Sequence, residues 1–320
     1  MNSSLSNKEI KTKEIKTKKR RKPGKYKLFL MAVPFLVLTF LFSYLPLYGW
    51  RYAFYDFKPG IPLSQSTYVG LQWFKSMVLN PIQRDEIIRI MRNTFAMSGI
   101  GILTSFLPLM FAMFLVEIKS NWFKKMVQIL TTIPNFISWI LVFSIAFTLF
   151  STDGGFVNQV LMNIGIIKAP IQFLGSDDHT WMAMFLWGTW KGLGWGAIMY
   201  LAAITGIDQE LYEAARVDGA GRFRMMWNIT LPSLLPTYFV LLMLSIAGFL
   251  NNGMDQYFIF QNPINQNHIE VLDLYVYNIG ITGGSFSLAT AVSMLKSLVS
   301  VFLLVIANGL SKLFRGESIV

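Results

Sequence analysis

The chain has 320 residues, of which 53% are hydrophobic and only 14% are charged. Soluble domains carry about 25% charged residues, so this composition excludes an ordinary soluble protein and indicates an integral membrane protein. The formal net charge of +11 is concentrated at one end, because residues 1–27 hold 11 basic and 2 acidic side chains while the rest holds 17 and 15. That tail has one aromatic residue, Tyr26, and no stacking platform, so we expect no nucleic-acid partner.

The N-terminal tail, residues 1–27, precedes an uncharged run at 28–50. A signal peptide has an apolar core of about 7 to 15 residues, whereas this run has 23 residues and no small-residue cleavage site follows it. We therefore interpret 28–50 as an uncleaved first membrane span. The tail is then a cytosolic flank. Anionic lipid stabilises each of its basic residues near the membrane surface by at most about 1 kcal/mol.

A membrane span requires about 20 apolar residues, because lipid cannot hydrogen-bond an open backbone. Three more uncharged windows occur downstream, and two further windows contain one lysine each, Lys191 and Lys296. These windows predict an all-α integral membrane fold with six transmembrane helices within residues 28–313. The predicted spans are about 28–50, 93–116, 126–149, 181–204, 232–250 and 286–310.

Basic residues accumulate on the cytoplasmic side of membrane proteins, and they orient the predicted helices. The basic segments are the tail, the loop with Lys119, Lys124 and Lys125, the loop with Arg216, Arg222 and Arg224, and the end with Lys312 and Arg315. In contrast, 150–180 has Lys168 as its single Lys or Arg and 251–285 has none. Both termini, including the short end 314–320, are therefore predicted to be cytosolic. The segment 51–92 disagrees, since it places six basic residues on the predicted outer side.

The residues that usually carry chemistry are sparse. The chain contains no cysteine, which excludes disulfides and thiolate sites. His179 and His268 lie about ninety residues apart in separate predicted outer loops, and no HExxH or EF-hand pattern occurs. We therefore expect no metal site and no cofactor bound by this chain.

The segment 206–232 is unlike a simple connector between two spans. Asp208 is predicted as a helix N-cap, Glu210 as an acidic residue of the first turn and Gly219 as the helix stop. A second short helical stretch, 222–228, is predicted to follow before the next span. The alternative is an amphipathic hairpin that rests on lipid, but anionic headgroups would repel the acidic residues of this surface. A protein partner on the cytosolic face fits the pattern better.

This segment resembles the EAA signature of the transmembrane subunits of ATP-binding-cassette importers. The signature is Glu-Ala-Ala, three residues, Gly, nine residues and Ile-x-Leu-Pro, and every spacing fits. The matching residues are Glu213, Ala214, Ala215, Gly219, Ile229, Leu231 and Pro232. The resemblance implies a type I importer (MetI-like) permease fold, in which residues near 208–228 form a coupling helix that docks into a groove of a separate ATPase subunit.

The same resemblance implies residue roles and partners. Within a coupling segment at 207–231, the residues expected to couple to the ATPase are Asp208, Glu210, Glu213, Ala214, Ala215, Asp218, Gly219 and Arg222. The implied partners are a second homologous permease in a heterodimer, two ATPase subunits that bind ATP and Mg, an extracellular lipid-anchored substrate-binding protein and membrane lipid. Because no Walker A pattern occurs in the chain, we expect a non-catalytic subunit. The resemblance also implies a location in the cytoplasmic membrane of a bacterium.

A wider likeness, over nearly the whole chain, is to MalF-like sugar permeases of the LplB/YteP type. Residues that carry it are Tyr44, Pro46, Gly49, Asp56, Gly155, Asn158, Asn252, Gly253, Asp255, Gln256, Gln261, Asn262, Pro263, Asp273, Tyr275, Lys296 and Asn308. Members of that group import oligosaccharides or polysaccharide fragments, some of them acidic or complex. The likeness therefore implies a glycan as the cargo.

Sugar recognition uses aromatic faces for the ring and amides or charges for the hydroxyl groups. The candidates for a substrate path are Asn135, Trp139, Trp187, Trp190, Lys191, Phe249, Asn251 and Asn252. For the tryptophans, lipid contact or core packing is the competing interpretation. A lysine at a helix centre costs about 2.5 to 3.5 kcal/mol on insertion scales, so Lys191 should face a cavity, a partner helix or an acid. Contact with a carboxylated sugar and a purely structural contact both stay open for Lys191 and Lys296.

Two other functional classes are compatible with several membrane spans. An integral-membrane enzyme acting on lipid-linked glycans would need a second acidic cluster beside Asp177 and Asp178, and none is evident. A proton-driven secondary carrier would need inward-facing acids, but no Asp or Glu lies within a predicted span. A transporter subunit that receives its energy from a partner is the preferred interpretation.

Overall fold

The computed structural model describes residues 25–315, and nearly all of its regular structure is helical. The tail at 1–24 and the end at 316–320, for which a cytosolic location is predicted, lie outside the described residues. The described chain divides into two units, one that ends at Gly49 and one that begins at Trp50. Each unit is described by itself.

The first unit consists of α1 (Lys25–Thr39) and a π-helical turn (Phe40–Tyr44), after which a 3-10 stretch (Leu45–Phe54) leads into the second unit. The helical run Phe29–Phe54 is long and apolar enough to cross a membrane, and none of its most apolar window is buried by the chain itself. In water such exposure would be unfavourable, whereas a bilayer solvates apolar side chains on every face. This run matches the first predicted span.

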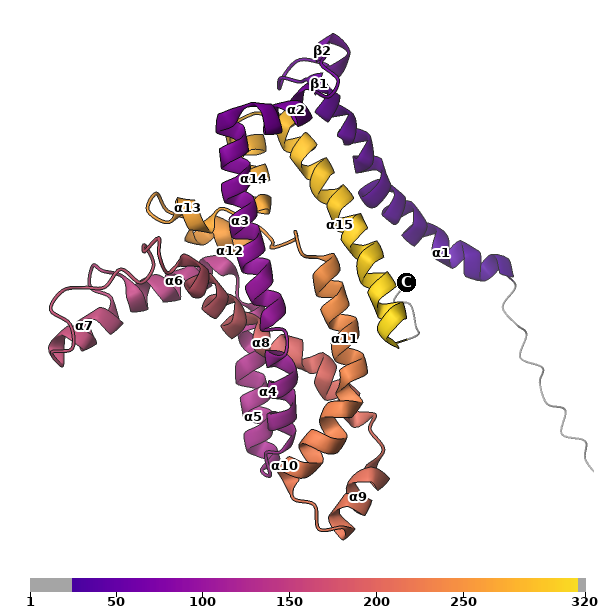
Figure 1. Ribbon diagram of the computed structural model, residues 1–320, viewed down its shortest axis with the longest axis vertical. Helices are drawn as coiled ribbons and strands as arrows, with labels where there is room; N and C mark the ends of the chain where they lie inside the picture. The colour runs from indigo at the N-terminus through magenta and orange to yellow at the C-terminus, as the bar shows by residue number, and fades with distance from the viewer. Residues whose placement is uncertain (1–24, 316–320) are drawn as a thin grey trace, which may run out of the picture. The chain divides into compact units, whose positions relative to one another are not determined.

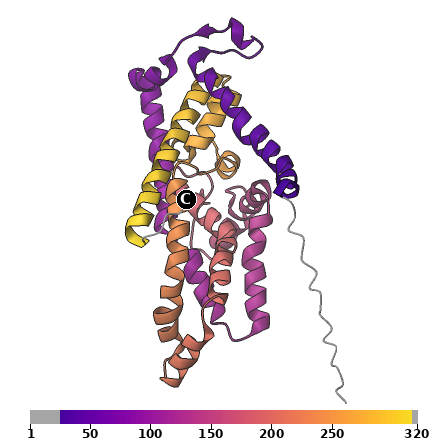
Figure 2. The same cartoon turned by 90° about the vertical axis from the view of Figure 1, so that its right-hand side faces the viewer.

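The second unit begins with a small hairpin of β1 (Tyr55–Asp56) and β2 (Thr67–Tyr68), which pair antiparallel and enclose a 3-10 turn at Leu63–Gln65. Helix α2 (Gln72–Leu79) follows, and its Trp73 donates a hydrogen bond from Nε1 to the carbonyl of Tyr55 at 3.0 Å. The hairpin and α2 lie at one end of the second unit, the hairpin end. Helices α9 (Gln209–Val217) and α10 (Arg222–Met225) lie at the opposite end (Figures 1 and 2).

Helices α3 (Pro81–Leu103) and α4 (Leu107–Val116) form one apolar stretch with a short break between them. The side chain of Asn80 caps α3, and Pro81 occupies its first position, where a missing N–H costs nothing. The helix that contains the predicted span at 93–116 begins earlier, at Pro81, and carries several charged residues in its first turns. Those charges have partners within the fold, as described below.

The predicted span at 126–149 is broken. Helix α5 (Asn121–Thr132) and the 3-10 turn Ile133–Phe136 form one arm, and α6 (Trp139–Phe150) forms another at 107° to it. Two local features accompany the break, because Pro134 lacks a backbone donor and Ser138 caps a new helix by accepting a hydrogen bond from Leu141 N–H.

Helix α7 (Phe156–Asn163) follows α6, and α8 (Thr180–Thr205) covers the predicted span at 181–204. Helix α9 (Gln209–Val217) is separate, but α10 (Arg222–Met225), the π turn Met226–Thr230 and α11 (Leu231–Ala247) form one continuous helical run. The predicted helical stretch at 222–228 therefore continues into the next span, and Pro232 occupies an early position of α11, directly after the π turn.

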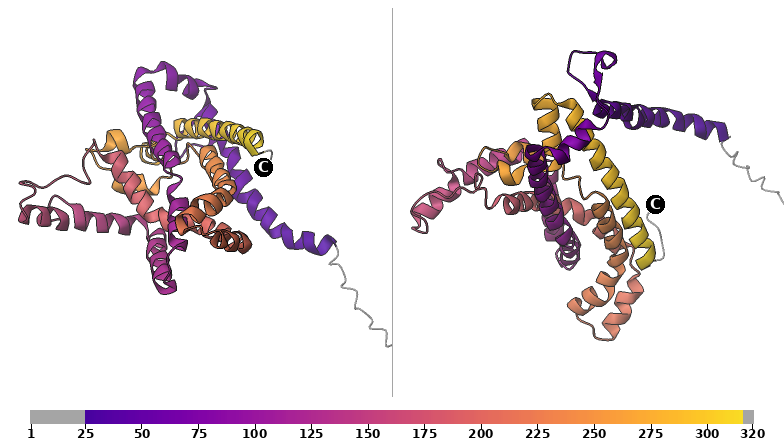
Figure 3. Two further views of the ribbon diagram at one scale, coloured as in Figure 1. Left: turned by 60° about the horizontal axis from the view of Figure 1, so that its bottom comes forward. Right: turned by 45° about the horizontal axis from the view of Figure 1, so that its top comes forward.

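The C-terminal part contains three short helices and one long one. The short helices are α12 (Asp255–Phe260), α13 (Gln266–Ile269) and α14 (Leu272–Tyr277), which a π turn at Asn278–Thr282 extends. Helix α15 (Phe286–Arg315) packs beside α11 (Figures 1 and 3). The long helix accounts for the predicted span at 286–310.

Within residues 25–315, four helical runs are long and apolar enough to cross a membrane, or five if the bent pair α5–α6 counts as one span. The runs are Phe29–Phe54, Pro81–Val116, Arg222–Ala247 and Phe286–Gly309. Helix α8 has 26 residues and is not among them. Its length suffices for a span, but its glycines, tryptophans and Lys191 lower its mean hydropathy.

Buried side chains of the described chain gather in three clusters. One lies near the hairpin end and includes Ile90 of α3 and Tyr275 of α14. A second joins α6, α8 and the short helices around Phe260. The third joins α4, α8 and α11 around Met226. Helix α8 takes part in two of them and therefore links the middle of the unit to its α9 end.

Candidate functional site

Helix α9 is a short helix with well-formed ends. The side chain of Asp208 accepts a hydrogen bond from Glu210 N–H at 3.0 Å, which confirms the predicted N-cap. Glu210 lies in the first turn and Arg216 in the last turn, so both charges complement the helix dipole. The hydroxyl groups of Tyr212 and Thr230 lie 2.9 Å apart and connect α9 to the π turn.

The chain leaves α9 through a left-handed glycine, as the sequence predicts. Gly219 has φ +76°, a conformation that other residues rarely adopt. Gly219 N–H donates to the carbonyl of Arg216 at 3.1 Å and Ala220 N–H donates to that of Ala215 at 2.9 Å. This pair of bonds is a Schellman motif, which satisfies carbonyl groups at the helix end. A Cβ at Gly219 would meet nothing within 4 Å, so the glycine is needed for its backbone angle and not for space.

Apart from the contact of Tyr212 with Thr230, the surface of α9 is largely uncovered within the described chain. None of its residues is buried, and Val217 is 88% exposed. Leu211 and Phe223 are also large apolar side chains at the surface. Among the residues that the structure describes, Glu213, Asp218 and Arg222 form no ion pair. Helix α9 is thus an amphipathic, capped and largely uncovered element at one end of the unit.

Lys191 lies at the break between α5 and α6. Its Nζ donates to the carbonyl of Asn135 at 2.7 Å and to that of Pro134 at 3.3 Å. The same Nζ lies 5.4 Å from the centre of the Trp139 ring. Three of the predicted substrate-path residues, Asn135, Trp139 and Lys191, therefore meet at one point, where they contact one another.

Trp187 and Trp190 belong to an aromatic group on the same helix, α8. Their ring centres are 5.8 Å apart, and Phe150 approaches Trp187 to 6.0 Å. With Phe173, Leu174, Ala183 and Leu186 these rings line an open hollow of about 380 Å³. Trp190 is 43% exposed. Aromatic faces that border an open hollow can stack on a sugar ring.

The remaining predicted path residues lie after the end of α11. The carbonyl of Phe249 accepts a hydrogen bond from the Ser98 hydroxyl of α3, and Asn252 Nδ2 donates to that hydroxyl at 2.9 Å. The carbonyl oxygen of the Asn252 side chain is buried without a partner among the described residues. Asn251 is exposed. The eight predicted residues therefore form two groups, one around the α5–α6 break and α8, the other between α3 and the end of α11.

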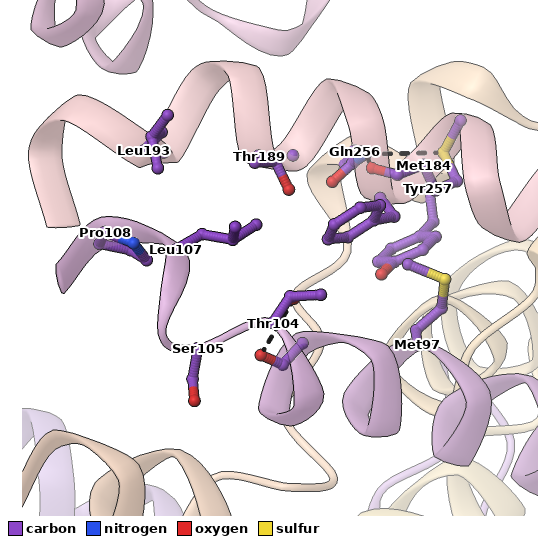
Figure 4. Close-up of a pocket in the computed structure, with 14 residues that line it drawn as sticks. Met97, Thr104, Ser105, Leu107, Pro108, Met184, Thr189, Leu193, Gln256 and Tyr257 are labelled. Carbon is purple, nitrogen blue, oxygen red and sulfur yellow. Dashed lines mark hydrogen bonds between the residues drawn. The ribbon is translucent and has the colours of Figure 1, made fainter. Parts of the chain in front are cut away.

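A further cavity was not predicted. It has a volume of about 270 Å³ and lies between the α3–α4 break, α8 and α12 (Figure 4). Thr104 and Ser105 come from the break, Thr189 from the facing wall of α8, and Gln256 from α12, where it donates to the carbonyl of Met184 at 2.7 Å. Gln256 belongs to the stretch that resembles sugar permeases, and that stretch is the one sequence signal that could have indicated this wall.

Near the hairpin end, charged side chains pair with one another. Arg89 of α3 contacts Glu270 at 2.7 Å, and the Glu270 side chain is only 5% exposed. Asn278 Nδ2 donates to the other Glu270 oxygen at 2.9 Å. Burial and then the carboxylate of Glu86, which accepts a hydrogen bond from the hydroxyl group of Tyr275, raise the pKa of Tyr275 above its ordinary range. These contacts explain the charges in the first turns of α3.

One further ion pair and one contact between a histidine and a carboxylate lie in the same part of the chain. Lys296 of α15 pairs with Asp273 of α14. His268 Nδ1 lies 2.6 Å from an oxygen of Asp177, in the segment that precedes α8. Lys296 therefore has an acidic partner within its own chain. Among residues 25–315, no three His, Asp or Glu residues are grouped in a way that could hold a metal ion.

Comparison with known families gives one match over most of the chain. The model of the family described as "Binding-protein-dependent transport system inner membrane component" matches residues 87–314. This range begins in α3 and includes α9, the α5–α6 break, both groups of predicted path residues and α15.

Two similar proteins come from Bacillus subtilis (strain 168). The chain is 39% identical to Protein LplB over 293 residues, which cover 91% of this chain and 90% of that protein. It is 38% identical to the polygalacturonan/rhamnogalacturonan transport system permease protein YteP over 293 residues, which cover 91% of this chain and 89% of that protein.

Two solved structures share the fold. One is a bacterial ABC transporter involved in the import of the acidic polysaccharide alginate, with a TM-score of 0.80, 30% identity, and coverage of 91% of this chain and 96% of that chain. The other is a bacterial alginate ABC transporter in complex with an alginate pentasaccharide-bound periplasmic protein, with a TM-score of 0.81, 30% identity, and coverage of 92% and 96%.

Proposed function

The chain belongs to the family of binding-protein-dependent transport system inner membrane components, the permease subunits of ATP-binding-cassette importers, and we propose that it imports oligosaccharides released from polysaccharides. Membership in this family means that the chain is a non-catalytic permease in the inner membrane. The family match therefore argues against the two alternative functions, an enzyme acting on lipid-linked glycans and a proton-driven carrier.

The observation that carries the proposed energy coupling is the largely uncovered surface of α9. Its ends are closed by Asp208 and Gly219. Leu211 and Val217 are exposed, and Glu213 forms no ion pair among the described residues. A short helix that is rigid but uncovered suits a groove on another subunit. We propose that two ATPase subunits, which hold the ATP and Mg, supply that groove, and that Glu213 pairs with a basic residue there.

The proposed cargo rests on the relatives. One similar permease is named for polygalacturonan and rhamnogalacturonan transport, and the similar structures belong to a transporter of an acidic polysaccharide. A hollow lined by Trp187 and Trp190 suits sugar rings, and the amides of Asn251 and Asn252 suit hydroxyl groups. We place the substrate path along α8 and the end of α11, as half of a passage that a second homologous permease completes.

The proposed orientation puts α9 and both termini in the cytosol and the hairpin end outside. It is supported by the basic residues of the tail and of the α9–α10 region. A substrate-binding protein would then deliver the glycan at the hairpin end. ATP-driven closure of the two ATPases would displace α9 and rock the spans around a site within the membrane.

The test is purification of the full chain from its native membrane through an affinity tag, in a mild detergent. The expected result is co-purification of two ATPase copies and one second permease. In proteoliposomes, this complex should take up an oligosaccharide when receptor and ATP are present. Recovery of the chain alone, with normal uptake in cells that lack the ATPase, would refute the proposal.

A further inference from the structure

Helix α8 is directly joined to the proposed coupling helix. Only residues 206–208 separate the end of α8 from the start of α9. Two hydrogen bonds tighten this link, from Gly206 N–H to Ala203 O at 3.1 Å and from Ile207 N–H to Ile204 O at 3.2 Å. A displacement of α9 therefore acts on α8 without a flexible connector between them.

Lys191 lies in the middle of α8 and contacts both sides of the broken span. The carbonyl groups of Pro134 and Asn135 stand at the end of the first arm, where helix ends leave acceptors without intrahelical donors and carry partial negative charge. Trp139 is the first residue of the second arm. The ammonium group of Lys191 lies over the face of its ring. The positive charge of Lys191 thus connects α8 to both arms of the α5–α6 break.

A second contact brings the two helices together one turn further along. A Cβ built at Gly194 would lie 2.3 Å from the carbonyl oxygen of Thr131, far inside van der Waals distance. The absent side chain lets α8 touch the backbone of α5 directly. Gly194 thus provides the close approach, and Lys191 provides the directional contact at the bend.

We propose that Lys191 is a positioning residue that transmits the displacement of α8 to the broken span α5–α6. The inference rests on the proposed function, because the displacement originates at α9. It assigns Lys191 a mechanical role and not a cargo-binding role, since its ammonium group already faces two carbonyl oxygens and a ring. Acidic and neutral sugars should depend on it equally.

The principal test compares Lys191→Met with Lys191→Arg in the reconstituted full importer. Methionine keeps the apolar stem but removes the charge, so Asn135 loses the one side-chain donor that the described residues offer it. We expect uptake per ATP hydrolysed to fall about tenfold in Lys191→Met, which is within the usual range of coupling between sites. Lys191→Arg keeps a cation with several donors and should retain most of the coupling. Receptor-stimulated ATP hydrolysis should continue in both variants.

The matched control is Lys168→Met. Lys168 is exposed in the segment after α7 and forms no ion pair among residues 25–315, so its loss should leave uptake per ATP unchanged. If Lys191→Met and Lys168→Met both couple normally, the proposed role of Lys191 is wrong. If Lys191→Arg is as defective as Lys191→Met, the charge is not the operative feature and the inference also fails.

A second measurement reports the geometry without any cargo. The chain has no cysteine, so a single pair can be introduced at Leu130 and Ile140, which are exposed on either side of the break. Spin labels on this pair should show one narrow distance distribution in the parent complex and a wider one in Lys191→Met. An unchanged distribution in Lys191→Met would overturn the inference.

Two further measurements distinguish the mechanical role of Lys191 from a cargo-binding role and from the proposed function itself. Uptake of tetragalacturonate and of a neutral galactotetraose should fall by the same factor in Lys191→Met, and a selective loss of the acidic sugar would instead make Lys191 a cargo ligand. A Glu213 variant should impair coupling as well. Normal coupling in the Glu213 variant would count against the proposed function, whereas a defect there with normal coupling in Lys191→Met would remove only the role of Lys191.

Discussion

The two ends of the second unit differ in whether their charged side chains form ion pairs within the chain. At the hairpin end, Arg89 pairs with Glu270 and Lys296 pairs with Asp273, all within one chain. At the α9 end, Glu213 and Arg222 have no ionic partner among the described residues. Paired charges hold a chain's own segments in place, whereas unpaired charges on a capped helix remain available to another subunit. We therefore expect substitutions at the hairpin end to lower stability, and substitutions at the α9 end to impair transport with smaller effects on stability.

The largest expected effect is on the stability of the hairpin end. Replacing Arg89 by alanine leaves the Glu270 carboxylate buried without its cation, and breaking a buried ion pair typically costs about 3 to 5 kcal/mol. The Arg89→Ala complex should unfold at a clearly lower temperature in detergent. Its matched control is Arg84→Ala, because the pair of Arg84 with Asp85 is exposed and such pairs contribute about 0 to 1 kcal/mol. Equal losses in the two variants would contradict the contrast between the two ends.

A smaller effect is expected at Gly219. Alanine at this position must adopt a left-handed backbone, which costs about 1 to 2 kcal/mol for an L-residue. Because nothing lies within 4 Å of the added Cβ, the cost should be local to the end of α9. We expect Gly219→Ala to insert into the membrane normally and to lose transport. Gly221→Ala is a suitable control, since Gly221 has an ordinary extended backbone and equal free space.

The N-cap of α9 should contribute about 1 kcal/mol. Asp208→Ala removes the acceptor for Glu210 N–H, and losses of this kind usually cost about 0.5 to 2 kcal/mol. Asp208→Asn or Asp208→Ser should restore most of it. Hydrogen exchange of the α9 amides is the appropriate measurement, because faster exchange in Asp208→Ala would reveal fraying. Unaltered exchange would show that the tertiary contact of Tyr212 with Thr230, and not the cap, holds this helix.

The smallest effect on stability is expected at Glu213. Exposed substitutions without partners usually change stability by less than about 0.5 kcal/mol, so Glu213→Ala should unfold like the parent chain. Uptake should nevertheless fall sharply if the carboxylate pairs with an ATPase. The measurement is uptake together with thermal unfolding of the same preparation. If Glu213→Ala lowered the unfolding temperature but left uptake unchanged, the proposed difference between the two ends, stability at Arg89 and coupling at Glu213, would be wrong.

Features set by neighbouring residues could be predicted from the sequence. The Asp208 cap and the Gly219 stop depend on a few consecutive residues, and the structure confirms both. The all-α membrane class followed from apolar windows, and the family match confirms the permease fold. The resemblance of Glu213, Ala214, Ala215, Gly219, Ile229, Leu231 and Pro232 to the EAA signature indicated the segment for which we propose the coupling role.

Features that depend on tertiary contacts could not be predicted. Pro134 accompanies a sharp break, whereas Pro34 and Pro236 lie inside continuous helices. A proline is thus insufficient without the cap at Ser138 and the contact from Lys191. The partners of Lys191 are separated from it by more than fifty residues, which no local pattern reports. The cavity beside Gln256 is formed by three distant segments and has no sequence signature of its own.

The π turn at Met226–Thr230 joins the proposed coupling region to α11 without a break. Such a turn hydrogen-bonds over five residues instead of four and contains one residue more than the α-helical turn. Conversion of this turn to ordinary α-helix would therefore rotate everything before it by about 100° relative to the following helix. The length of this one turn therefore sets the direction in which α10 and the proposed coupling region face relative to α11.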